Sequence, residues 1–247
     1  MTSWLTANPT YKQCAIGNGA FSDALRRRLK LPLPGINTGQ RCAACASLIE
    51  PFGLHANCCM KIEKSNRHKI VQEAAALCMR EGSAAVVRNP QVEAFYQKKP
   101  EAPEEDVDNT KSQGDIGITL KNINVGGNLT IVDFTVVAPV KGTAVPYEKA
   151  GDLADQKEKS KVVQYESRYD IPKGRIIGFA IETTGPWGPA AKRLMWSVAE
   201  ACGGTPDLIA RRYRRYTEVI SVALQVALYN SHSRFLAVCI KAPVIGG

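Results

Sequence analysis

The residues best suited to binding a metal ion form a cluster of cysteines and one histidine. Two residues separate Cys42 from Cys45, nine separate Cys45 from His55, and Cys58 and Cys59 follow closely. Tetrahedral zinc prefers thiolate and imidazole ligands, and a two-residue gap lets both sulfurs reach one ion from a tight turn. We expect Cys42, Cys45, His55 and either Cys58 or Cys59 to hold a structural zinc ion. The alternative is a group of unpaired buried cysteines.

Two aspartates in candidate strands indicate a second kind of metal site. Asp115 opens one strand in GDIGI, and Asp133 lies inside another in IVDFTVV, on the same face as Ile131 and Thr135. A carboxylate within an apolar strand is costly unless a cation compensates it. We expect Asp115 and Asp133 to bind magnesium or manganese, which can generate a hydroxide nucleophile and stabilise charge on a phosphodiester. For Asp115, a surface position at a strand end is the alternative.

A lysine-rich segment follows the second strand. Lys157, Lys161 and Tyr165 are spaced four apart, so they share one face of a helix. A lysine beside a metal-bound water can orient that water or offset charge in the transition state. The alternative for any one of these lysines is a solvated basic face.

The charge of the chain favours a polyanionic partner. It has 32 lysines and arginines against 23 aspartates and glutamates, a formal charge of +9 and a pI of about 9.2. Arginines cluster at positions 26–28 and around Arg211 and Arg212. This balance is typical of proteins that contact phosphate backbones, so we predict a nucleic-acid partner.

The chain shows no sequence signal for a membrane or for secretion. No apolar run approaches the ~20 residues that a membrane span needs, and the first residues lack the pattern of a secretory signal. We therefore expect no membrane association and a reducing compartment, either nucleus or cytosol. Cys14, Cys78, Cys202 and Cys239 are scattered along the chain and are expected in the core.

The elements that must position these side chains alternate as in an α/β protein. Periodicity and caps predict helices at 22–30, 66–81, 150–168, 189–201 and 206–230, with Ser22 and Asn66 as the first two caps. Alternation and β-branched residues predict strands at 115–122, 129–138 and 175–183. We also expect an exposed acidic loop at 98–113 and a turn at 125–128.

The order of these motifs resembles the restriction-like PD-(D/E)XK endonuclease region, with a CCHC zinc knuckle, at the carboxyl end of non-LTR retrotransposon reverse-transcriptase proteins. The resemblance covers roughly residues 14–240. It is carried by CAAC, His55 with Cys59, Arg67-His68, GDI, VDFTVVAP, K-x-x-x-Y, the RLKLPLP lead-in and IETTGPWGPAAKRL at 181–194.

This resemblance implies a PD-(D/E)XK nuclease-like mixed sheet flanked by helices (residues 64–247) after a helix and zinc knuckle (residues 1–63). Asp115 and Asp133 match the acidic metal ligands, and Lys161 matches the catalytic lysine. Cys59 becomes the favoured fourth zinc ligand. The chain departs from the superfamily motif at Thr135, where that motif has lysine.

The remaining site residues are assigned to nucleic acid or left open by the same resemblance. Arg67, His68 and Tyr165 are expected to contact DNA or shape its site, and the charge clusters add the basic pair Arg211 and Arg212 to the expected DNA contacts. Glu182 is expected either to reach the metal or to cap a loop.

The function expected from these assignments is DNA nicking with magnesium or manganese. RNA, a reverse transcriptase and a larger complex are further candidate partners. The alternative is a catalytically decayed nucleic-acid-binding module or a structural scaffold.

Overall fold

The computed structural model describes most of the chain. The described ranges are 3–36, 39, 41–59, 65–101, 113–120, 129–138 and 149–240. In chain order the elements are α1 (Ser3–Thr6), η1 (Lys12–Cys14), α2 (Asn18–Arg28), α3 (Leu54–Cys58), α4 (Ser65–Gly82), β1 (Ser83–Arg88), η2 (Val92–Ala94), β2 (Gln97–Lys98), β3 (Ile116–Leu120), β4 (Thr130–Val137), α5 (Asp152–Glu166), β5 (Tyr169–Asp170), β6 (Ile176–Glu182), α6 (Pro189–Ala201) and α7 (Pro206–Ile240). The domain boundary expected after residue 63, the turn expected at 125–128 and most of the acidic segment 98–113 lie outside the described residues.

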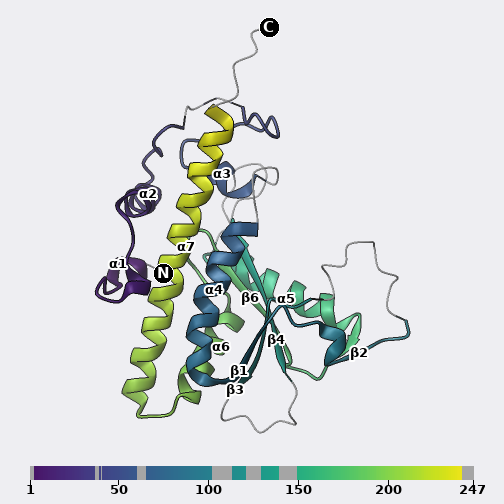
Figure 1. Ribbon diagram of the computed structural model, residues 1–247. Coiled ribbons are helices and arrows are strands. Elements are labelled where there is room, and N and C mark those ends of the chain that lie inside the picture. Colours follow the sequence, from purple (N-terminus) through teal and green to yellow (C-terminus); the bar gives the residue numbers. More distant parts are fainter. Residues whose placement is uncertain are drawn as a thin grey trace.

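Four strands form a mixed sheet in the order β1-β3-β4-β6. β3 pairs antiparallel with both β1 and β4, whereas β6 runs parallel to β4. Parallel neighbours need a crossover connection, and α5 supplies it between β4 and β6. Helices flank the sheet, which confirms the predicted α/β class (Figure 1).

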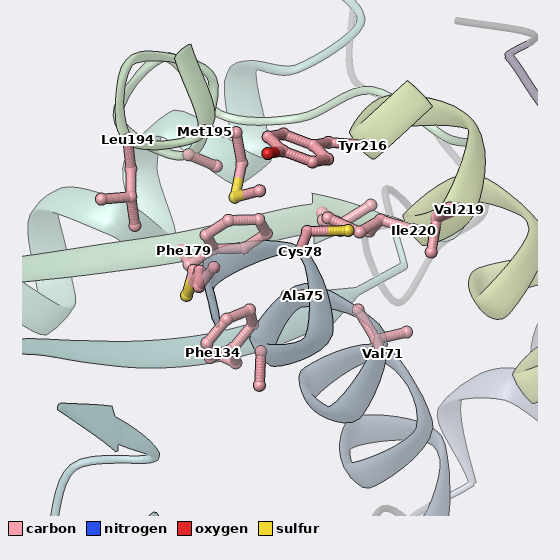
Figure 2. Close-up of a cluster of buried hydrophobic side chains, with 14 of the residues drawn as sticks. Val71, Ala75, Cys78, Phe134, Phe179, Leu194, Met195, Tyr216, Val219 and Ile220 are labelled. Carbon is pink, nitrogen blue, oxygen red and sulfur yellow. The ribbon is translucent and has the colours of Figure 1, made fainter. Parts of the chain in front are cut away.

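The main hydrophobic core lies between one face of the sheet and helices α4, α6 and α7. Val132 and Phe134 of β4 point into it, and the Phe134 ring stacks on Phe179 of β6 with centroids 4.4 Å apart (Figure 2). Ile131 packs in a separate cluster with Tyr165 of α5. The two faces of β4 therefore alternate as the sequence predicted, and the Asp133 face is the one that α5 covers.

Helix α7 is the longest element and joins the two ends of the molecule (Figure 1). It continues to Ile240, well beyond the predicted end at residue 230. His232, beyond the predicted end, is buried, and its Nδ1 lies 2.5 Å from Asp23 Oδ2 of α2. Neither α7 nor any other described helix is long and apolar enough to cross a membrane.

Both predicted helix caps were wrong, and one strand was missed. Helix α2 begins at Asn18 after Gly17, so Ser22 lies inside the helix and is not its cap. Helix α4 begins at Ser65, which places Asn66 in its first turn. Strand β1 was not predicted, because its alanine-containing sequence SAAVVR directly follows a helix and lacks a clear alternation.

Two buried carboxylates fix α5 to its neighbours. Glu182, at the end of β6, accepts hydrogen bonds from the backbone N–H groups of Gly151 (2.9 Å) and Ala154 (3.5 Å). It therefore caps the amino end of helix α5, whereas the sequence analysis expected it to reach the metal or to cap a loop. An acceptor at this position satisfies N–H groups that have no partner within the helix.

The second carboxylate, Glu158, belongs to α5 and caps α6. Its oxygens accept hydrogen bonds from the N–H groups of Ala190 and Ala191, each at 2.8 Å, and of Ala180 at 3.4 Å. Burial raises the pKa of Glu158, while the three backbone donors lower it and leave a net upward shift. The three contacts tie α5 both to β6 and to the start of α6.

Replacing Glu158 by alanine is expected to destabilise the protein by about 2–4 kcal/mol, because three buried N–H groups lose their acceptor. Urea unfolding followed by circular dichroism measures the change. Gln156→Ala, at an exposed position of the same helix, is the control and should shift stability by less than about 0.5 kcal/mol. Wild-type stability in Glu158→Ala would contradict the capping role.

Candidate metal centres

The cysteine and histidine side chains predicted to bind zinc lie together in the structure. The ligand atoms of Cys42, Cys45, His55 and Cys59 are all within 4.8 Å of one another. Cys59 Sγ lies 3.9 Å from Cys42 Sγ and 3.8 Å from Cys45 Sγ, and Cys45 Sγ lies 3.3 Å from His55 Nε2. The side chain of Cys58 lies outside the described residues.

These distances fit a tetrahedral zinc ion. Two thiolates at about 2.3 Å from zinc and at the tetrahedral angle lie about 3.8 Å apart. The two sulfur–sulfur distances to Cys59 match that value. The cluster could therefore bind zinc through three sulfurs and one imidazole nitrogen, and four protein ligands would make such a site structural.

A tight turn and a short helix present the four ligands. The Cys42 carbonyl accepts a hydrogen bond from the Ala46 N–H at 2.8 Å, and the Cys42 N–H donates to the Ser47 carbonyl at 2.8 Å. His55 lies in α3, and the Cys59 N–H donates to the His55 carbonyl at 2.8 Å. The turn and the helix thus bring the four ligand atoms close together around one point.

The carboxyl-terminal part of α7 supports this cluster from one side. The Phe235 ring packs edge-on against the His55 ring, with centroids 5.7 Å apart, and belongs to the same buried cluster as Cys42 and Cys59. Hydrogen bonds from Ser47 lower the pKa of the Cys45 thiol to about 6. A thiolate is the form of cysteine that binds metal.

The two predicted acidic ligands lie side by side across β3 and β4. Asp115 immediately precedes β3, and its Oδ2 accepts a hydrogen bond from the Phe134 N–H at 2.6 Å. That bond holds the Asp115 carboxylate against β4, next to Asp133. Both carboxylates are largely buried, with side-chain exposures of 23% for Asp115 and 9% for Asp133.

Helix α5 brings two donors to Asp133. Lys161 Nζ and the Tyr165 hydroxyl each lie 3.0 Å from Asp133 Oδ2. Burial raises the pKa of Asp133, the Lys161 ammonium lowers it and the Asp115 charge raises it, with a net upward shift. Burial and the Asp133 charge raise the pKa of Tyr165, so its phenol remains a donor.

A glycine permits this close approach of α5. Gly178 of β6 pairs with Asp133 in the parallel register and faces α5. A Cβ at this position would lie 2.5 Å from the Glu158 carbonyl oxygen. Any larger residue would push α5 away from the sheet and separate Lys161 from Asp133.

Helix α4 holds Asp115 from the other side. His68 Nε2 lies 3.0 Å from Asp115 Oδ1, and one turn later Gln72 donates to the Asp115 carbonyl oxygen at 2.8 Å. Burial raises the pKa of Asp115, but the hydrogen bond and charge of His68 and the Phe134 amide outweigh it, so the pKa lies below its usual value. Asp115 is therefore an anion at neutral pH.

Arg67, the neighbour of His68, connects the zinc-binding segment to β4. Its side chain is buried, and its guanidinium donates to the carbonyl oxygens of Asn57 in α3 and, at 3.5 Å, Val136 in β4. The first turn of α4 thus contacts both candidate metal centres. The predicted contact of Arg67 and His68 with DNA stays a prediction.

A pocket of about 320 Å³ opens beside Lys161, whose ammonium contacts Asp133. The start of α4, the end of β4 and the middle of α5 line it, and His68, Thr135 and Lys161 are among the lining residues. Thr135 lies on the Asp133 face of β4, as its spacing predicted. Neither aspartate lines the pocket, but Lys161 and His68, which contact Asp133 and Asp115, do.

The predicted basic pair on α7 lies elsewhere. Arg211 forms an exposed ion pair with Asp207 at 2.8 Å, and Arg212 donates to the Gly203 carbonyl. Neither residue lines the pocket beside the aspartates. Their contact with nucleic acid stays a prediction.

Glu158 and Gln72 are the functionally placed residues that sequence reasoning missed. Glu158 lies between two lysines in a charged helix, so its sequence suggested an exposed position, and only its spacing of three from Lys161 hinted at proximity to the site. Gln72 follows His68 by four positions and so lies on the same face of α4. That spacing was the available signal.

No family model, curated protein or solved structure matches the chain.

Replacing Cys45 by serine is expected to abolish stoichiometric zinc binding and to lower the melting temperature by at least about 5 °C, because structural zinc contributes to folding. Cys45 is exposed, so the change removes a ligand and little packing. Zinc content by mass spectrometry and thermal unfolding measure the two effects. Cys202→Ser, a thiol outside the cluster, is the control. A zinc content and melting temperature equal to wild type would refute the site.

Proposed function

We propose that the chain is a magnesium- or manganese-dependent DNA endonuclease of the restriction-like PD-(D/E)XK kind, with an adjoining zinc knuckle. One observation carries the proposal. Asp115, Asp133 and Lys161 come from three separate segments and lie together: Asp115 is held against β4 beside Asp133, and Lys161 contacts Asp133 and lines a pocket. The resemblance implies that these three residues form one catalytic centre.

The aspartate pair fits a divalent cation. Two carboxylates lie next to each other in a largely buried position, and the Asp115 charge opposes the ionisation of Asp133. Oxygen ligands of this kind suit magnesium, which binds through one or two carboxylates and retains several waters. When bound, such an ion would supply Lewis-acid assistance and an activated nucleophile for attack at phosphorus.

The protein side chains around the pair have separate roles in this proposal. His68 and the Phe134 amide fix the Asp115 carboxylate, and Tyr165 fixes Asp133. Lys161 lies at the pocket, where its ammonium would offset charge on the phosphate or orient the nucleophile. Each of these groups is held in place before substrate binds, which is the condition for efficient electrostatic stabilisation.

The departure at position 135 is compatible with this proposal. Thr135 and Asp133 share one face of β4, and Thr135 lines the pocket. A lysine at 135 would place its ammonium near the phosphate, and here Lys161 reaches the same region from α5, with Nζ 3.0 Å from Asp133 Oδ2. We infer that the helix supplies the cation that the strand lacks.

The partners follow from the proposed chemistry. DNA is the substrate, and RNA, a reverse transcriptase or a larger complex are candidates for further contacts of the basic surface. The alternative is a binding module or scaffold that retains this architecture without catalysis, and metal-dependent cleavage separates the two.

Wild-type protein is expected to nick supercoiled plasmid with magnesium or manganese and not with EDTA. Asp133→Asn should reduce the nicking rate at least about 100-fold, because asparagine keeps the shape of the side chain but removes the negatively charged metal ligand. DNA binding in the same variant should be retained, as measured by fluorescence anisotropy.

Asp155→Asn is the matched control, since Asp155 lies on α5 and pairs with Lys159, not with the site. Its nicking rate should equal that of wild type. Undiminished nicking by Asp133→Asn would overturn the metal assignment. Absence of nicking by folded wild-type protein would favour the binding-module alternative.

A further inference from the structure

The pocket beside the aspartates has a second cation that the proposed chemistry does not use. Lys157 lines it one helical turn before Lys161, and Ser160 lies between them on the same wall. Lys161 is engaged with Asp133 at 3.0 Å. Within the described part of the chain, no carboxylate lies within ion-pair distance of Lys157.

Its neighbour on the same helix behaves differently. Lys159 pairs with Asp155 at 2.6 Å, is 73% exposed and lines a different pocket on the other side of α5. Of the three lysines on this helix, Lys161 therefore pairs with Asp133 and Lys159 with Asp155, whereas Lys157 is exposed at the pocket and has no ion pair among the described residues. Such a position suits an anionic ligand group.

We propose that Lys157 and Ser160 bind the backbone phosphate that neighbours the scissile phosphate on the cleaved strand. Residues four apart on a helix lie about 6 Å apart along its axis. Two cations at that spacing can each meet one of two successive phosphates of a nucleic-acid strand. The Ser160 hydroxyl can donate a hydrogen bond to the same phosphate that Lys157 attracts.

The opposite wall of the pocket suits the rest of a nucleotide. Val136 and Val137 at the end of β4 contribute apolar surface there. A sugar can pack against this surface while its two flanking phosphates face α5. An acidic peptide has no sugar ring between successive charges to pack on this surface, so a nucleic-acid strand is the favoured ligand.

This assignment rests on the proposed nuclease function. It predicts that loss of Lys157 weakens substrate binding but leaves the rate of the chemical step unchanged. Lys157→Gln should raise KM for an oligonucleotide duplex roughly tenfold, as expected for one charged hydrogen bond, and leave kcat nearly unchanged. The slope of log binding constant against log salt should decrease in magnitude by about 0.9, the value for one lost phosphate contact. Lys159→Gln, with the same charge change on the same helix, should alter neither quantity.

Replacing one charged phosphate of the substrate by a neutral linkage shows which phosphate Lys157 contacts. After the nick is mapped, duplexes that carry one methylphosphonate next to it are compared. Wild type should lose about tenfold in kcat/KM at one neighbouring linkage, and Lys157→Gln should lose nothing further there. An equal additional loss in both proteins would overturn the subsite.

The failure of this inference is distinguishable from the failure of the nuclease proposal. Normal nicking with an unchanged KM and salt slope in Lys157→Gln overturns the subsite alone. If wild type does not nick, the nuclease proposal fails, and the salt slope of duplex binding still decides: a smaller slope in Lys157→Gln than in Lys159→Gln supports the phosphate contact, and equal slopes overturn it.

Discussion

The burial of Asp133 in the middle of an apolar strand is the constraint on which the rest of the site depends. An ionised carboxylate in this position is costly unless cations and donors compensate it. Lys161 and Tyr165 supply that compensation from α5. Helix α5 must therefore lie close to the sheet and be rotated about its axis so that both donors face Asp133. Gly178 allows the close approach, and a shift of one residue along α5 would turn both donors away.

The position of α5 is in turn set by carboxylates that have no part in the proposed chemistry. Glu182 caps α5 from the end of β6, and Glu158 links α5 to the start of α6. On the other side, α4 holds Asp115 through His68 and reaches the cysteine cluster through Arg67. The segment that carries the candidate zinc ligands thus contacts the same helix that orients the first aspartate, so a zinc ion bound there would influence the geometry of the second centre.

Much of this arrangement could be predicted from local sequence patterns. The β-branched alternation of β4 placed Asp133 opposite the main core, and the spacing of four put Lys161 and Tyr165 on one helical face. Residue type and spacing indicated three of the candidate zinc ligands, and the choice of Cys59 over Cys58 came from the resemblance. Contacts between distant segments were not predictable. Nothing in the sequence near His232 indicates its buried pair with Asp23. Nothing near Glu158 indicates that its carboxylate accepts hydrogen bonds from the N–H groups at the start of α6. These omissions shortened α7 and left the anchoring of α5 unexplained.

The most direct test of the central claim is a crystal structure of the protein grown with manganese, with anomalous data collected at the manganese and zinc edges. We expect a manganese peak between the carboxylates of Asp115 and Asp133 and a separate zinc peak among the three sulfurs and the imidazole. A zinc peak together with an empty aspartate pair, in crystals that contain excess manganese, would contradict the account of the catalytic centre.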